Sequence, residues 1–152
     1  MADKLQFELV SPEKLLLAEA VAMVVVPGSE GNFGVLPGHT LLISTVRPGV
    51  IDVYADEQSQ VSERIFVSGG FAEVTPERCT VLADEALPLS ALDRGDLEQQ
   101  QKMLEATMAS IRDQAARLQG AQRDNMLAEL AAAERKLAVV AAKLSALAGA
   151  AH

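Results

Sequence analysis

The chain is poor in the residue types that most often build catalytic and metal centres. Its 152 residues include no tryptophan, one cysteine (Cys79) and two histidines, of which the second is the last residue. A single cysteine excludes a disulfide framework within the chain and a cysteine-based metal cluster. Two distant histidines leave a zinc site short of ligands. We therefore expect no metal site, and we expect Cys79, in the strand-like run CTVL, to be a small buried hydrophobe.

Long apolar runs and clusters of basic residues are missing as well. The longest apolar run, residues 20–26, is far below the ~20 residues that span a bilayer. The N-terminus lacks the basic and apolar regions of a signal peptide. No lysine lies between Lys14 and Lys102, whereas binding to nucleic-acid phosphates requires clustered lysine and arginine. The sequence predicts a soluble chain without direct membrane insertion, for which nucleic acid is a poor partner.

Composition divides the chain into two parts. The aromatic residues all lie in the first half; they are Phe7, Phe33, Tyr54, Phe66 and Phe71. Residues 1–88 hold five Lys/Arg against thirteen Asp/Glu, a balance of −8, whereas residues 89–152 hold eight of each. This difference predicts two architectures in one chain. The acidic excess of the first part fits either simple solubility or a platform that faces a basic partner.

The first part is predicted to be an antiparallel β-sandwich or flattened barrel. Residues 5–9 (LQFEL) alternate apolar and polar side chains, which is typical of a strand with one buried face. Residues 20–26 (AVAMVVV) suit a single strand that is covered on both sides. Further strands are expected over residues 41–46, 50–54, 61–67, 71–74 and 80–82. Turn signals separate these runs at intervals of about eight to twelve residues, without a helical period between them.

The second part is predicted to be an antiparallel helical hairpin. Ser90-Ala-Leu-Asp93 fits a capping pattern in which Ser90 accepts a hydrogen bond from the N–H three residues on. Gly120 is expected to end the first helix, within a short polar connection over residues 119–125. Each helix carries a narrow apolar stripe at heptad spacing, so the two helices are expected to face each other. The expected seam residues are Leu104, Ile111, Leu118, Leu130, Leu137 and Leu144.

Alanine occupies many of the remaining positions of the second stripe. Such a face buries little apolar area, at ~25 cal/mol per Å². The hairpin is therefore predicted to be marginally stable and able to open or to dock again elsewhere.

Residues 28–39 (GSEGNFGVLPGH) contain four glycines and one histidine. A Walker-type phosphate loop needs a lysine after its last glycine, but His39 and Thr40 follow here. A dinucleotide-binding turn would lead into a helix, whereas a strand is expected next. We interpret the glycines as a shaped turn that Pro37 stiffens, and His39 as a structural histidine on that turn. No Ser/His/Asp or Cys/His pattern is present, so no catalytic residue is assigned.

Four segments together resemble the epsilon subunit of the F-type rotary ATP synthase. They are residues 25–39 (VVPGSEGNFGVLPGH), 47–49 (RPG), 68–71 (SGGF) and 81–84 (VLAD). The resemblance covers the β-segment in order and at consistent spacing, and the two-helix segment agrees in architecture. It implies a β-sandwich of about ten strands over residues 1–88 and a regulatory helical hairpin over residues 89–152.

The resemblance also implies a role, partners and a location. In that family the subunit is a non-catalytic part of the central stalk. Its sandwich binds the gamma subunit and rests on the polar loops of the membrane c-ring, which couples proton-driven ring rotation to ATP synthesis. Its helices can reach the alpha and beta subunits of the catalytic head and inhibit ATP hydrolysis. The implied location is peripheral, on the cytoplasmic face of the bacterial inner membrane, through the complex.

The c-ring-facing turn of the family maps here to Glu30, Gly31, Asn32 and His39. Some relatives have an acidic residue at the position of Asn32. Glu30 is therefore expected to supply the charge, opposite the arginine that c-ring loops commonly carry.

Some bacterial members of the family bind ATP through an Ile/Leu-Asp-x-x-Arg-Ala motif on the helical domain. Leu92 and Asp93 match its first two residues, but Asp96 and Leu97 stand where Arg and Ala belong. Asp96 adds negative charge where an anionic ligand needs positive charge, so we assign no cofactor and keep ATP binding as an open alternative. Two rival hypotheses for the whole chain also stay open. One is a free-standing β-sandwich adaptor with an oligomerisation hairpin, and the other is a nucleotide hydrolase built around the glycine turn.

Overall fold

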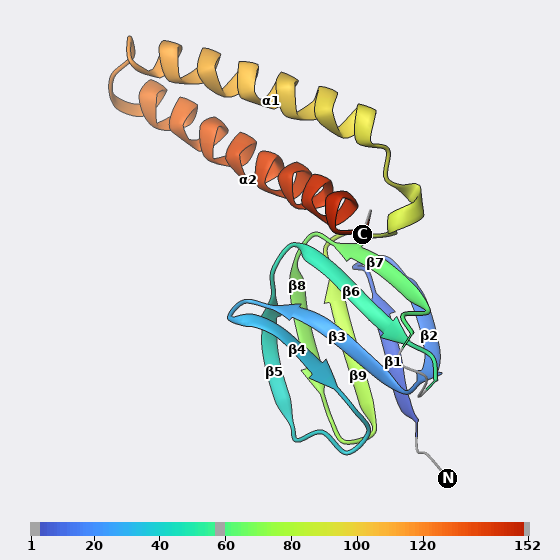
Figure 1. The fold of residues 1–152 in the computed structure, drawn as a ribbon. Coiled ribbons are helices and arrows are strands. Elements are labelled where there is room, and N and C mark those ends of the chain that lie inside the picture. Colours follow the sequence, from blue (N-terminus) through green and yellow to red (C-terminus); the bar gives the residue numbers. More distant parts are fainter. Residues whose placement is uncertain (1–3, 57–59, 151–152) are drawn as a thin grey trace. The chain divides into compact units, whose positions relative to one another are not determined.

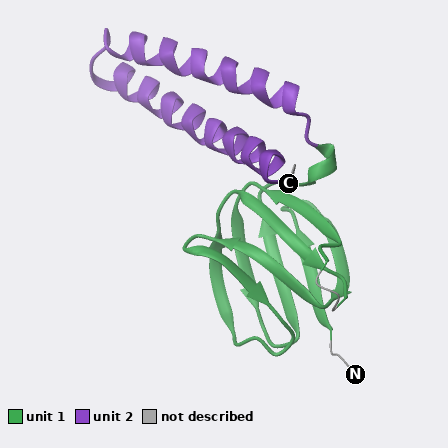
Figure 2. Cartoon of the chain, in the orientation of Figure 1, with its two compact units in different colours: residues 1–91 green, residues 92–152 purple. Residues whose placement is uncertain are grey.

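A computed structural model describes residues 4–56 and 60–150 of the chain. The chain divides into two compact units, Met1–Ala91 and Leu92–His152, which Figure 2 shows in separate colours. We refer to them as the β-unit and the helical unit. The β-unit consists of strands and one short 3-10 turn, and the helical unit consists of two α-helices (Figure 1).

The β-unit contains ten strands that form one folded-over sheet. They are β1 (Leu5–Val10), β2 (Leu15–Val21), β3 (Met23–Gly28), β4 (Gly31–Val35), β5 (Leu42–Val46), β6 (Gly49–Tyr54), β7 (Glu63–Val67), β8 (Gly70–Val74), β9 (Arg78–Ala83) and β10 (Ala86–Pro88). The strand order is β10-β7-β6-β3-β5-β8-β9-β1-β2, and β4 pairs with β3 outside this path. One residue pair, Gly28 with Val46, joins β3 to β5. The sheet therefore turns over at this junction into the two layers of a sandwich, as predicted (Figure 1).

One strand pair differs from the expected antiparallel pattern. β1 and β9 run parallel, from Gln6 opposite Arg78 to Val10 opposite Leu82. The other strand pairs of the described residues are antiparallel. Parallel neighbours require a long crossover, and here strands β2 to β8 lie between the two partners in the chain. Short-range turn signals could not reveal this pairing.

Alternation of side chains places the core between the layers. Leu5, Phe7 and Leu9 of β1 are buried, whereas the residues between them are half-buried. Cys79 of β9 is also buried, as expected. The run of residues 20–26 proves to be two strands and not one, because β2 ends before Ala22 and β3 begins after it. The N–H of Ala22 donates to the carbonyl oxygen of Tyr54 at 2.8 Å, at the point where the chain passes from one layer to the other.

The helical unit consists of α1 (Arg94–Ala115) and α2 (Gly120–Ala150). The predicted cap at Ser90 is wrong, since Ser90 lies in the 3-10 turn η1 (Leu89–Ala91). Asp93 caps α1 instead, and its Oδ1 accepts from the N–H groups of Gly95 at 2.9 Å and Asp96 at 3.4 Å. A carboxylate next to the positive end of the helix is the stronger acceptor for these N–H groups.

The connection between the helices is shorter than predicted. It spans residues 116–119, because α2 already begins at Gly120. Residues 121–125 are exposed but helical, since alanine, glutamine and arginine at the start of this segment are good helix formers.

The two helices pack as an antiparallel pair with a thin interface (Figure 1). Of the expected seam residues, Ile111 is buried, and the five leucines (Leu104, Leu118, Leu130, Leu137 and Leu144) are half-buried. The buried side chains of the unit are Leu97, Met108, Ile111, Ala115, Ala133 and Val140. Two of these six are alanines, so the interface offers little apolar area per helical turn.

Candidate functional site

The glycine-rich stretch contains a strand that the sequence did not suggest. The sequence predicts one turn over residues 28–39, but β4 pairs with β3 from Val24 opposite Val35 to Gly28 opposite Gly31. Ser29 and Glu30 form the two-residue tip of this hairpin. Gly31 has a φ of 137°, a value that residues with a Cβ rarely adopt and that fits the requirements of tight hairpins. The glycines thus shape a projecting hairpin, which we call the β3–β4 tip (residues 28–32).

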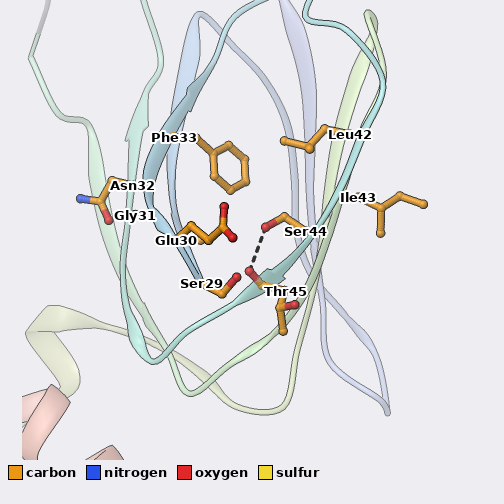
Figure 3. Close-up of a pocket in the computed structure, with 10 residues that line it drawn as sticks. Ser29, Glu30, Gly31, Asn32, Phe33, Leu42, Ile43, Ser44 and Thr45 are labelled. Atoms are coloured by element: carbon orange, nitrogen blue, oxygen red, sulfur yellow. Dashed lines mark hydrogen bonds between the residues drawn. The ribbon is translucent and has the colours of Figure 1, made fainter.

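A hollow of about 450 Å³ lies between the β3–β4 tip and β5, lined by residues 28–33 and 42–45. Figure 3 shows the Glu30 carboxylate inside the hollow, on the same side as the ring of Phe33. Phe33 and Leu42 are partly buried against the core and give the hollow an apolar wall. Ser29 and Ser44 add hydroxyl groups at its rim, and the Ser44 hydroxyl donates to the Thr45 carbonyl oxygen at 3.0 Å. The hollow thus combines one carboxylate with an aromatic face and an aliphatic side chain.

The residues predicted for the c-ring-facing turn do not all meet at this place. Glu30, Gly31 and Asn32 lie together at the β3–β4 tip. His39 lies beyond the opposite end of β4, on the order of 15 Å of strand away. There the half-buried His39 side chain makes a 2.7 Å hydrogen bond through Nδ1 with the carbonyl oxygen of Thr40, a local contact that fits a structural role.

Arg47 is a component of the tip that sequence reasoning missed. Its Nη1 donates to the carbonyl oxygen of Gly28, and its Nη2 donates to Oδ1 of Asn32 at 2.7 Å. The Asn32 side chain points away from the hollow (Figure 3). Arg47 stands in the RPG segment, and a basic residue in a turn carries no sequence signal for a contact 15 positions earlier in the chain.

A row of apolar side chains, exposed except for the half-buried Val10, crosses the outer face of the layer that contains β8, β9, β1 and β2. Leu15 of β2 stands opposite Val10 of β1, Val10 stands opposite Leu82 of β9, and Leu82 stands opposite Phe71 of β8. The exposed fractions are 56% for Leu15, 45% for Leu82 and 58% for Phe71. We call these four residues the outer row. Aligned apolar side chains on four adjacent strands form a contiguous patch, which is a common mark of a protein–protein interface.

Ionisable groups of the β-unit are shifted mainly by burial. Burial raises the pKa of Glu19, and the neighbouring Glu63 carboxyl raises it further by repulsion and a hydrogen bond. Burial also raises the pKa of Asp52, against the opposing effect of Arg64, whose Nε lies 3.6 Å from its Oδ1. Burial raises the pKa of Cys79 to about 12. The thiol is therefore protonated at neutral pH and is a poor nucleophile.

The described residues contain no group of three or more histidine, cysteine, aspartate or glutamate side chains that could hold a metal ion. Within the same residues, neither helix is long and apolar enough to cross a membrane.

The four residues that align with the nucleotide-binding motif, Leu92, Asp93, Asp96 and Leu97, lie at the start of α1. Leu92 is half-buried, and Asp93 uses its carboxylate to cap the helix. Asp96 is exposed in the first turn, and Leu97 is buried. No basic side chain is contributed by these four positions.

Comparison with known proteins identifies the family of the chain. Residues 4–89 match the family model described as ATP synthase, Delta/Epsilon chain, beta-sandwich domain. The chain is 63% identical over 113 residues to the ATP synthase epsilon chain of Rhodospirillum centenum, covering 74% of this chain and 77% of the relative. It is 48% identical over 136 residues to the ATP synthase epsilon chain of Rhodospirillum rubrum, covering 90% and 99%.

A solved structure is similar in fold. A chain in the cryo-EM structure of the Euglena gracilis mitochondrial ATP synthase (OSCP/F1/c-ring) superimposes with a TM-score of 0.66 at 23% identity, over 100% of this chain and 84% of the other.

Proposed function

This chain belongs to the family of ATP synthase epsilon chains, and from that premise we propose that it is a non-catalytic subunit of the rotary central stalk. The observation that carries the proposal is the relative that is 48% identical and aligns with 90% of this chain, across both units. A free-standing adaptor or a hydrolase would have no reason to share both units, in order, with such relatives. The chain would couple proton-driven rotation of the c-ring to ATP synthesis in the catalytic head.

We place the contact with the c-ring at the β3–β4 tip. The hollow beside the tip presents the Glu30 carboxylate, the ring of Phe33 and the side chain of Leu42 (Figure 3). An arginine side chain from a polar c-ring loop suits this combination, because its stem packs on apolar groups while its guanidinium pairs with a carboxylate and stacks on an aromatic face. The balance of −8 over residues 1–88 would favour approach to such a basic loop.

We place the contact with the gamma subunit at the outer row. Leu15, Leu82 and Phe71 are each about half exposed in this chain, and covering them would supply the apolar centre that a stable interface needs. Contacts at the tip and at the outer row would hold the β-unit between ring and stalk. The chain would then be peripheral to the bacterial inner membrane, on its cytoplasmic face, through the complex.

The c-ring contact is tested by replacing Glu30 with glutamine. We expect the variant to need about three- to tenfold more subunit to restore ATP-driven proton pumping to epsilon-depleted ATP synthase, because a partly desolvated ion pair is lost. Pumping is measured by quenching of a pH-sensitive dye as a function of added subunit. Glu13→Gln, at an exposed position in the β1–β2 turn, is the matched control and should titrate like the native chain. Equal titration of the Glu30 variant would contradict this contact.

We further propose that the helical unit regulates ATP hydrolysis by opening and reaching the alpha and beta subunits. Its thin interface, with two alanines among six buried side chains, supports an arrangement that can come apart at modest cost. We keep the assignment of no bound nucleotide, since Asp93 is engaged as a cap and Asp96 brings no positive charge.

Removal of residues 92–152 tests this division of labour. We expect the remaining β-unit to restore proton pumping at about the same concentration as the full chain, because the tip and the outer row are intact. Inhibition of hydrolysis by the added subunit, measured as phosphate release, should be lost. A truncated chain that no longer binds the complex would show that the helical unit is needed for assembly. That result would contradict the proposed regulatory role of this unit.

A further inference from the structure

Arg47 joins the β3–β4 tip to the end of β5. Two main-chain hydrogen bonds already connect these segments, from the Ser29 N–H to the Thr45 carbonyl oxygen at 3.0 Å and from the Arg47 N–H to the Pro27 carbonyl oxygen at 2.9 Å. These bonds hold the β3 side of the hairpin. They leave the β4 side without an attachment to β5.

The Arg47 side chain supplies that second attachment. One guanidinium nitrogen donates to Gly28 on β3, and another donates to Asn32 on β4. A single planar group thus spans both strands just where the tip begins. Lysine, with one ammonium group, does not have this fixed fork of donors.

The β4 side needs such an attachment because β4 is an edge strand. It pairs with β3 and with no second strand among the described residues. The pairing of β3 with β6 ends at Val25. Apart from the single pair of Gly28 with Val46, the part of the hairpin nearest the tip therefore has only two strands, an arrangement that is marginally stable in water. The tip also projects Glu30, whose side chain is exposed, so the direction of this carboxylate depends on how firmly the tip is held.

We propose that Arg47 is a positioning residue for c-ring docking, which clamps both strands of the β3–β4 tip and so directs Glu30 into the hollow beside β5. Asn32 then serves as the anchor for the clamp, and it is not itself a contact to the ring. Its side chain points away from the hollow (Figure 3), and its carbonyl oxygen accepts a hydrogen bond from Arg47. This inference rests on the proposed docking of the tip to the c-ring.

The test compares four single variants of the full-length chain and the double variant Arg47→Met/Asn32→Leu. Arg47→Met removes the clamp, Asn32→Leu removes its acceptor at similar volume, and Asn32→Asp keeps an acceptor and adds charge to the bond. Arg64→Met is the control, because it removes another exposed arginine of the β-unit, one that pairs with Asp52 on neighbouring strands. Two properties are measured for each: amide hydrogen exchange of residues 31–33 in the isolated chain, and the subunit concentration that restores proton pumping.

We expect Arg47→Met and Asn32→Leu each to speed exchange at residues 31–33 and to raise the restoring concentration, both by roughly three- to tenfold. The double variant should be no worse than either single variant, because both remove the same interaction. Asn32→Asp should retain native exchange and should restore pumping at no higher concentration than the native chain. If Asn32 acted only through general stability, Asn32→Asp would not restore native amide exchange.

The outcomes separate this inference from the docking proposal. If Arg47→Met behaves like Arg64→Met in both measurements, Arg47 is not a clamp. If Glu30→Gln raises the restoring concentration while Arg47→Met leaves it unchanged, docking through the tip stands and the positioning role of Arg47 is overturned. If Glu30→Gln itself has no effect, the docking proposal fails, and the role of Arg47 in docking fails with it even where exchange becomes faster.

Discussion

Replacement of Gly70 by alanine is expected to lower the free energy of unfolding of the β-unit by about 3 to 5 kcal/mol. Gly70 has a φ of 144°, and a Cβ at this position would overlap the main-chain carbonyl oxygen of Leu82. The obstacle is backbone on the neighbouring strand, so no side chain can move aside to relieve it. Gly70 also pairs with Val46 on β5 and Ala83 on β9, so any shift of its backbone disturbs three strands.

Urea denaturation followed by tyrosine fluorescence measures this effect. Tyr54 is the one tyrosine of the chain and lies in β6, so the signal comes from the β-unit alone. Gly34→Ala is the control, because a Cβ there would meet only the Met23 sulfur at an ordinary 3.8 Å. We expect its free energy of unfolding to stay within about 0.5 kcal/mol of the native value. Equal stability of the two variants would mean that the close approach of β8 and β9 is not rigid.

Replacement of Leu82 by glutamate is expected to weaken binding to the gamma subunit by about 100-fold or more. Leu82 lies in the middle of the outer row, between Val10 and Phe71. In the proposed interface a glutamate would be buried without a partner, a change that disrupts the centre of an interface. In the free chain Leu82 is 45% exposed, so the same substitution should leave the folding of the β-unit nearly unchanged.

Calorimetric titration of the purified gamma subunit with each variant measures the change in affinity. Leu127→Glu is a closely matched control, since Leu127 on α2 is a leucine with 42% exposure. It should bind gamma like the native chain. Native affinity of the Leu82 variant would place the gamma-binding surface elsewhere on the β-unit.

Local patterns predicted most strands but not how they pair. The alternation of residues 5–9 identified β1 because one face of that strand lies on the core. The run of residues 20–26 is apolar throughout, so nothing in it marks the break at Ala22, which depends on a hydrogen bond to Tyr54. The parallel pairing of β1 with β9 likewise depends on contacts between distant parts of the chain. Tertiary pairing decides these features, and local sequence does not record it.

The candidate site was predictable in part for the same reason. The resemblance to a known family directed attention to Glu30, Gly31 and Asn32, which the structure places together at the β3–β4 tip. It also included His39, which lies beyond the end of β4 that is far from the tip. Arg47 was overlooked because its contacts with Gly28 and Asn32 arise when β5 returns alongside the hairpin. Side-chain contacts across a fold follow from its topology, and short motifs do not contain them.

The thin interface between α1 and α2 has a thermal consequence. The heat-capacity change of an unfolding step grows with the apolar area that it exposes. Apart from alanines, the fully buried side chains of the helical unit are Leu97, Met108, Ile111 and Val140, and the five seam leucines are already partly exposed. The free energy of separation is then nearly linear in temperature, without the dome-shaped curve of a well-packed core. Cooling would not drive the helices apart, and the fraction of separated helices would change in one direction only across the temperatures at which a cell grows.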